Sequence, residues 1–117
     1  MAQRILRHPR TRENLLEEYL FIAAESPHAN EAAAERFLEA VEETLARLAA
    51  MPGMGRKWHG SRAVEGLRLF AVKGFENWLT FYTPIADGIH FRVLVHAARD
   101  LPRCLENLRA GEGDHRG

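Results

Sequence analysis

The sequence of 117 residues has one cysteine, Cys104, and no excess of charge of either sign. A single cysteine cannot form an internal disulfide, and without a second cysteine or an identified base we expect its side chain to pack rather than to react. Lysine plus arginine and aspartate plus glutamate number 16 each, so no overall positive field attracts the chain to nucleic acid. Nucleic-acid binding would need a local basic patch.

Other missing features narrow the function classes further. The sequence has no nucleotide-binding glycine loop, no paired-cysteine zinc pattern and no glycine-flanked serine nucleophile, and we therefore expect no cofactor and no metal site. It also lacks an apolar run long enough for a signal peptide or a membrane span. We accordingly expect no membrane contact and a cytoplasmic location.

The length favours one domain, because a second core would leave each half near the size at which burial barely offsets chain entropy. Residues 111–117 contain no apolar side chain, and we expect them to form a flexible C-terminal tail. The sequence therefore predicts a single domain over residues 1–110.

Two amphipathic helices are predicted in the first half of the chain. The first begins at Thr11. Ser26-Pro27 marks a break and a restart, with Asn30 as an equally good cap, and the second helix runs to about Met51, before Pro52-Gly53. The residues expected to face the core are Leu15, Leu16, Tyr19, Leu20, Ile22 and Ala23 in the first helix and Ala34, Phe37, Leu38, Val41, Leu45 and Leu48 in the second. The glutamates expected on the solvent face of the first helix are Glu13, Glu17, Glu18 and Glu25.

The second half predicts three consecutive strands with no helix between them, at about residues 67–72, 78–83 and 89–96. Turn signals at Lys73-Gly74 and Asp87-Gly88 separate these strands. The second signal is the stronger hairpin signal because glycine accepts a positive φ without steric cost. The pattern is typical of an antiparallel meander.

Two further segments complete the predicted fold. Residues 4–7 contain a short apolar pair before Pro9, and we expect them to form one edge strand. Residues 54–65 show no hydrophobic period and are predicted to form a loop between helix and sheet. A helical hairpin packed on a strand meander gives a two-layer α+β domain.

Two side chains of the predicted meander are candidates for function. Arg68 is predicted to share a sheet face with Phe70 and Val72. Its guanidinium can clamp a phosphate or carboxylate of a partner, or pair with a helix glutamate of the same chain. Tyr82 is predicted to be a half-buried core anchor, with an acid or base role as the alternative.

The end of the last predicted strand carries further polar groups. Strand alternation predicts that His96 shares a face with His90, Arg92 and Leu94. His96 is interpreted as a rim histidine, with general acid or base as the alternative. Arg99 remains open between binding and structure, and Asp100 is predicted to cap a short helix.

The order of strand, helical hairpin and three-stranded meander resembles that of the RelE/ParE superfamily of toxins from bacterial toxin-antitoxin systems. Three motifs add to the resemblance: residues 48–56, Gly66-Leu67-Arg68, and Phe81-Tyr82 followed by residues 93–101. Together with the order of elements they cover residues 4–108. The resemblance implies a toxin that a partner antitoxin neutralises, but the superfamily carries two activities on one fold.

The sequence is closer to ParE-like toxins, in which a leucine-arginine pair opens the sheet and a histidine, then arginine-aspartate, follow the last strand. This resemblance implies a protein that binds DNA gyrase and stabilises its DNA cleavage complex without breaking a bond itself. The implied target-binding residues are Arg68, Tyr82, His96, Arg99, Asp100 and Arg103. The resemblance also implies a ParD-like antitoxin, which would lay an amphipathic segment over the helices and a sheet edge to form a hetero-oligomer.

The alternative is a RelE-like, ribosome-dependent mRNA endonuclease, which would make the chain an enzyme. Its implied catalytic residues are Arg68, Lys73, His96 and Arg99. Leu105 stands where some such toxins carry a tyrosine, and the zero net charge also counts against RNA cleavage. A third possibility is a relative that only binds its antitoxin and acts in repression of their operon.

Overall fold

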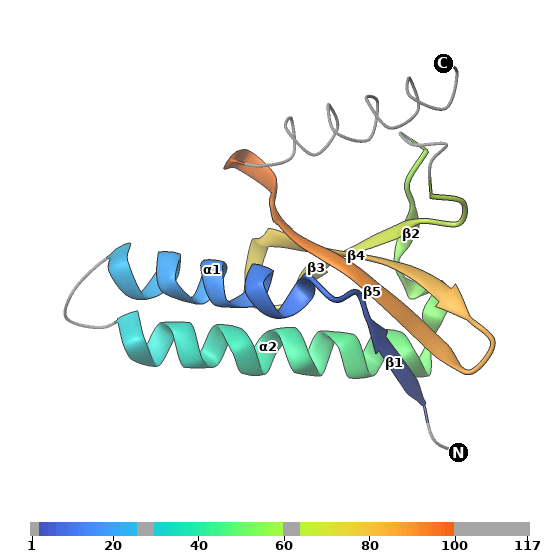
Figure 1. Ribbon diagram of the computed structural model, residues 1–117, viewed down its shortest axis with the longest axis horizontal. Helices are drawn as coiled ribbons and strands as arrows, with labels where there is room; N and C mark the ends of the chain where they lie inside the picture. Colours follow the sequence, from blue (N-terminus) through green and yellow to red (C-terminus); the bar gives the residue numbers. More distant parts are fainter. Residues whose placement is uncertain (1–2, 26–29, 60–63, 100–117) are drawn as a thin grey trace.

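The computed structural model describes residues 3–25, 30–59 and 64–99 (Figure 1). The elements follow in the order β1 (Arg4–Arg7), α1 (Thr11–Glu25), α2 (Asn30–Ala50), the 3-10 turn η1 (Pro52–Met54), β2 (Arg56–Lys57), β3 (Arg68–Val72), β4 (Phe75–Ile85) and β5 (Gly88–His96). The predicted α+β fold with an N-terminal strand, a helical hairpin and an antiparallel meander is confirmed. The predicted tail, residues 111–117, lies outside the described residues.

Within the described residues the sheet has five strands in the order β1-β5-β4-β3-β2. The meander of β3, β4 and β5 is antiparallel, whereas β1 pairs in parallel with β5, so that the sheet is mixed. β1 is an edge strand, as predicted, and Figure 1 shows it beside β5. The prediction of a loop over residues 54–65 is wrong at Arg56–Lys57, which pair with Leu69 and Arg68 as strand β2. Two residues are too few for a period to mark a strand.

The helical hairpin covers one face of the sheet. Figure 1 shows α1 and α2 lying side by side, and side chains of both helices and of the sheet form one core beneath them. The predicted apolar stripe of α2 is buried except for Leu38, which is partly buried. The sheet residues buried in this core are Val72, Trp78, Tyr82, Ile89, Phe91 and Leu94. Among the described residues, no helix is long and apolar enough to cross a membrane.

The predicted faces of α1 are wrong at several positions. Leu16 and Leu20, expected in the core, are 56% and 55% exposed, whereas Glu18, expected in solvent, is 3% exposed. The physical reason is that α1 packs against both α2 and the end of β5, so its buried face is rotated relative to the one that counting apolar residues suggests. Glu18 is tolerated inside because it has hydrogen-bond partners there.

A β-bulge changes the faces of β5. The strand carries one extra residue, Arg92, opposite the step from Phe81 to Tyr82 in β4. Phe91 and Leu94, which simple alternation would place on opposite faces, therefore both reach the core beneath the helices. The predicted shared face is wrong: Leu94 and His96 lie on the helix side, and His90 and Arg92 lie on the other side.

The hairpin between β4 and β5 forms where the sequence predicts it, but the reason given for its glycine is wrong. Gly88 is not among the described residues with positive φ, whereas Gly74 in the preceding turn has a φ of 83°. Gly88 is needed for space, because a Cβ there would lie 2.8 Å from the backbone nitrogen of Arg4. The absence of a side chain lets β1 approach β5.

Candidate functional site

Arg68 and Tyr82 are opposite each other on β3 and β4, and both bind the turn that follows α2. The Tyr82 phenol donates to the carbonyl of Pro52 at 2.7 Å and accepts from the N–H of Gly55 at 2.8 Å. Arg68 Nη1 donates to the carbonyls of Gly53 and Gly55. We call these three backbone residues and two side chains the turn cluster. It joins the end of the helical hairpin to the sheet.

The contacts of the turn cluster test the roles that the sequence predicts for Tyr82 and Arg68. Tyr82 is 0% exposed, so it is a core anchor whose burial is complete rather than partial. Burial raises the pKa of the Tyr82 phenol, and the Gly55 N–H and the Arg68 charge only partly offset this, so the phenol stays protonated at neutral pH. The predicted face of Arg68 is confirmed, because Phe70 and Val72 lie on the helix side. The described ion pairs do not join Arg68 to a helix glutamate.

A second cluster lies where α1 meets the end of β5. Nη2 of Arg99 donates to both carboxylate oxygens of Glu18, at 2.8 and 2.7 Å, and the Trp78 indole donates to the same carboxylate at 2.8 Å. The Arg99 guanidinium also lies over the ring of Phe21, 4.7 Å from its centroid. We call these residues, with His96, the arginine cluster. It gives a buried carboxylate three hydrogen bonds from charged or polar donors.

His96 closes the arginine cluster on the sheet side. Its Nδ1 accepts from the backbone N–H of Arg99 at 3.1 Å, and its ring meets Trp78 edge to face at 4.7 Å between centroids. His96 is half-buried, which agrees with the interpretation as a rim histidine. His96 and Arg99 lie at the end of the last strand, as predicted, whereas their partners on α1 and β4 were not predicted from the sequence.

The structure does not bring the four candidate nuclease residues together. Arg68 pairs with Tyr82 and His96 pairs with Trp78, so the two lie on strands that flank β4, four positions apart along it. Ladder and rise spacings set their backbone separation at about 16 Å. Lys73 is exposed in the turn between β3 and β4. The other two target-binding candidates, Asp100 and Arg103, lie outside the described residues.

The loop tryptophan has a structural position rather than a solvated one. Trp58 packs edge to face on Phe81, with 5.6 Å between ring centroids. It joins an apolar cluster on the sheet face opposite the helices, whose buried members are Leu67, Leu69, Phe81 and Val95. Trp58 is therefore held against the sheet, within the segment that was predicted to be a loop.

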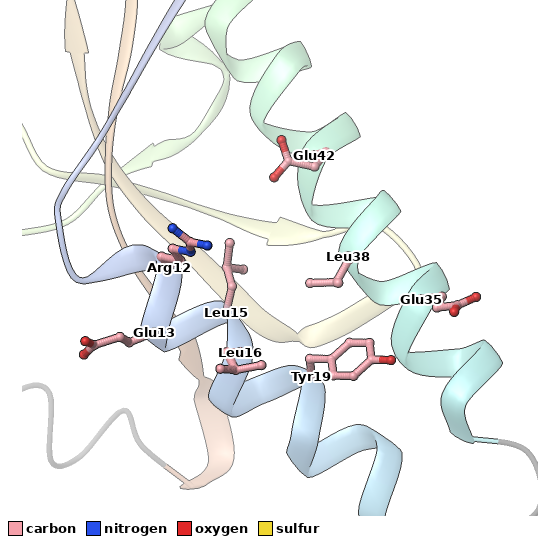
Figure 2. Close-up of a pocket in the computed structure, with 8 residues that line it drawn as sticks. All are labelled: Arg12, Glu13, Leu15, Leu16, Tyr19, Glu35, Leu38 and Glu42. Carbon is pink, nitrogen blue, oxygen red and sulfur yellow. The ribbon is translucent and has the colours of Figure 1, made fainter.

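A groove of about 930 Å³ lies between α1 and α2, and Figure 2 shows the residues that line it. Its lining is apolar in the centre and charged at the sides: Arg12, Glu13, Leu15, Leu16, Tyr19, Glu35, Leu38 and Glu42. Figure 2 shows Leu15 and Leu38 pointing into the space between the helices, while Glu13 and Glu35 point outward at either side. The exposed Leu20 extends the apolar surface along α1. The groove has the shape and chemistry to receive an amphipathic segment.

One end of the groove is fixed to the sheet. Glu42 accepts from Arg7 of β1 at 2.9 Å, and this hydrogen bond raises the pKa of the Arg7 guanidinium. Because Glu42 is already paired, the acidic charges left to a ligand of the groove are those of Glu13 and Glu35. Arg12 is the one basic residue among the lining residues.

Comparison with known protein families identifies the family of this chain. The family model described as the ParE toxin of type II toxin-antitoxin system, parDE, matches residues 5–101. The match includes both helices, the sheet and the two clusters described above. No curated protein matches the sequence. The resemblance stated from the motifs is confirmed, and with it a toxin that has an antitoxin partner. The chain belongs to the ParE toxin family of type II toxin-antitoxin systems.

Proposed function

We propose that this toxin binds DNA gyrase and stabilises its DNA cleavage complex, and that a ParD-like antitoxin neutralises it. One observation carries the proposal for the target: the two arginines that an RNA-cleaving toxin would need at a scissile phosphate have partners within the chain. Arg68 binds the carbonyls of the turn cluster and Arg99 binds Glu18. Catalysis of phosphoryl transfer requires positive charge directed at the developing charge on the substrate. A protein that acts by binding has no such requirement.

The position of the candidates relative to one another also supports binding without catalysis. Attack of a 2′-hydroxyl needs an acid-base group and a phosphate-binding group within hydrogen-bond reach of one substrate. The backbone positions of Arg68 and His96 are on the order of 16 Å apart across the sheet, and the phenol of Tyr82 is buried. The proposed mode of action is therefore that of a protein ligand of gyrase, not of an enzyme.

We assign the target-binding surface to the end of the sheet where β5 finishes and to the segment after it. His96 and Arg99 lie there, and 37% of the Arg99 side chain is exposed. Asp100 and Arg103 are further members of the proposed surface. Arg68 of the turn cluster also belongs to it, and Tyr82 contributes indirectly by supporting the turn that Arg68 binds. In this proposal the toxin domain spans residues 1–110, and residues 111–117 form a tail. Gyrase as the target also implies the cytoplasm as the location.

The antitoxin is proposed to occupy the groove between α1 and α2. Leu15, Leu16 and Leu38 offer apolar surface, and Glu13 and Glu35 flank it with negative charge. This combination suits an amphipathic helix with an apolar stripe and basic residues beside the stripe. The resulting complex is a hetero-oligomer.

Two assays run side by side test the proposed target. Purified gyrase is given relaxed plasmid, ATP and increasing amounts of the toxin, and a translation reaction with a defined mRNA receives the same amounts. We expect loss of supercoiling and intact mRNA. Intact supercoiling with mRNA cut at ribosome-bound sites would contradict the proposal in favour of the RelE-like alternative. A folded protein that affects neither assay but binds its antitoxin would leave only the operon-repressing alternative.

A further inference from the structure

The carboxylate of Glu18 has an unusual environment for a helix glutamate. Its side chain is 4% exposed, whereas 37% of the Arg99 side chain is exposed. The carboxylate accepts from the Trp78 indole as well as from Arg99, so each of its oxygens has at least one donor. A buried carboxylate needs such partners because burial removes the hydration that stabilises its charge.

Glu18 and its neighbours constrain Arg99 from several directions. The guanidinium is held by the carboxylate on one side and lies over the Phe21 ring, 4.7 Å from its centroid. The Arg99 backbone N–H donates to His96 at 3.1 Å. Phe21 and Glu18 both come from α1, while His96 ends β5. The arginine cluster thus fixes Arg99 against α1 at the point where the chain leaves the sheet.

Glu18 and Arg99 are affected differently when the other residue is removed. If Arg99 is removed, Glu18 keeps only the indole hydrogen bond and stays buried with its charge. If Glu18 loses its charge, the hydrogen bonds that Arg99 donates to it weaken, and the guanidinium has access to water because its side chain is already 37% exposed. Glutamine at position 18 has nearly the same shape and its amide oxygen can still accept from Trp78. Nη2 of Arg99 also donates to Oε1, the oxygen that accepts from Trp78. The E18Q variant therefore removes the charge attraction and the hydrogen bond to Oε2, and so weakens the restraint on Arg99 with little change to the core.

We infer that Glu18 is a positioning residue for target binding: its buried carboxylate fixes the Arg99 guanidinium and the start of the segment after β5 against α1. This inference rests on the proposed function, because it gives Arg99 a part in the target-binding surface. Glu18 itself contacts no target in this account. It acts through Arg99. Because Glu18 already holds the Arg99 side chain in one orientation, less conformational entropy is lost when the toxin binds its target.

Limited trypsin digestion tests the restraint without any gyrase. Cleavage after Arg99 requires its side chain to leave Glu18 and enter the specificity pocket of trypsin. We expect E18Q to accelerate this cleavage about tenfold, because proteolysis follows the population of the open state. Cleavage after the exposed Lys57 is the internal reference. The matched control is E17Q, the same chemical change at an exposed position of α1, which should leave both rates unchanged.

Gyrase inhibition by the same variants tests the functional part of the inference. We expect E18Q to need about tenfold more protein than the wild type or E17Q for half-inhibition of supercoiling, since the more weakly restrained Arg99 must be ordered on binding. The E18Q/R99Q double variant should then be no weaker than R99Q alone, because Glu18 acts through Arg99. If E18Q does not fold, E18D keeps the charge but shortens the side chain, and a smaller increase in cleavage after Arg99 is expected.

The outcomes separate this inference from the proposed function. Equal cleavage after Arg99 in E18Q and E17Q would overturn the inference, whatever the target is. Faster cleavage with unchanged half-inhibition would overturn the positioning role and leave Glu18 as a structural residue. A wild-type toxin that does not inhibit gyrase would instead refute the proposed function, and the trypsin result would still stand on its own.

Discussion

The backbone N–H of Gly55 donates to the phenol oxygen of Tyr82 at 2.8 Å, beneath the turn that follows α2. The two residues are so close that a Cβ at Gly55 would lie 2.8 Å from Cε1 of the tyrosine and 2.8 Å from the carbonyl oxygen of Leu69. Backbone atoms and a buried ring cannot move aside cheaply. Gly55 and Tyr82 therefore fix the end of the helical hairpin on the sheet.

We predict that G55A lowers the free energy of unfolding by about 2 kcal/mol through overpacking. The matched control is G53A in the same turn, where an added Cβ meets nothing within 4 Å. Urea unfolding followed by circular dichroism measures both variants. A G55A variant as stable as G53A would show that the turn relaxes without cost.

Removal of Arg99 should destabilise the toxin because it leaves the Glu18 carboxylate buried with one donor. We expect R99A to lower the free energy of unfolding by about 2 kcal/mol. In the E18Q/R99A double variant part of this loss should be recovered, since no buried charge remains. Thermal unfolding of the two single variants, the double variant and the wild type gives the coupling free energy. Additive losses would contradict a coupled pair. The loss also means that toxicity of R99A must be compared at equal amounts of folded protein.

The stability of the toxin should depend on pH through His90. Burial, with the charges of Arg92 and His8 nearby, lowers the pKa of His90 below 6.5. As the pH falls below about 6.5, the unfolded chain binds a proton at this residue before the folded chain does, so the free energy of unfolding decreases. Well above this pH His90 is neutral in both states and contributes no pH dependence.

The H90Q variant tests this assignment. Its free energy of unfolding should decrease less than that of the wild type between about pH 7.5 and about pH 5.5, because it lacks the imidazole that binds a proton more readily in the unfolded chain. Urea unfolding at several pH values gives the two slopes. Parallel slopes would show that His90 is not the group responsible.

If the antitoxin occupies the groove, a single negative charge introduced into its apolar lining should weaken antitoxin binding. Leu16 lines the groove and is 56% exposed, so L16E should fold normally and weaken antitoxin binding by about tenfold or more. Met51, 64% exposed and not among the residues that line the groove, provides the control M51E, which should bind as the wild type does. Isothermal titration with the antitoxin measures both affinities. Equal affinities for L16E and M51E would place the antitoxin elsewhere.

The fold could be predicted from the sequence where local patterns decide it. The stripe of α2 and the three strands of the meander follow from periodicity. The Asp87-Gly88 signal marked the position of the last turn correctly, although Gly88 is needed there for space and not for a positive φ. The parallel pairing of β1 with β5 and the bulge at Arg92 depend on contacts between distant parts of the chain. One inserted residue reverses the faces of a strand, which no alternating pattern reveals in advance.

The candidate site was partly visible in the sequence. Arg99 and His96 stood out at the end of the last strand, but their partner Glu18 was assigned to solvent. A signal was available, because Glu18 is three positions after Leu15 and four before Ile22, which is the spacing of one helix face. A glutamate on that face requires a buried partner. The identity of that partner, 81 positions away in Arg99, comes only from the structure.

Gyrase as the target is tested most directly by measuring DNA cleavage by gyrase in the presence of the purified toxin. Gyrase, supercoiled plasmid and ATP are incubated with increasing toxin, the reaction is stopped with detergent, and linear plasmid carrying covalently attached gyrase is quantified. We predict that linear plasmid accumulates as the toxin increases, and that prior addition of the antitoxin prevents this accumulation. Unchanged levels of linear plasmid and of supercoiling at a large excess of folded toxin would contradict gyrase as the target.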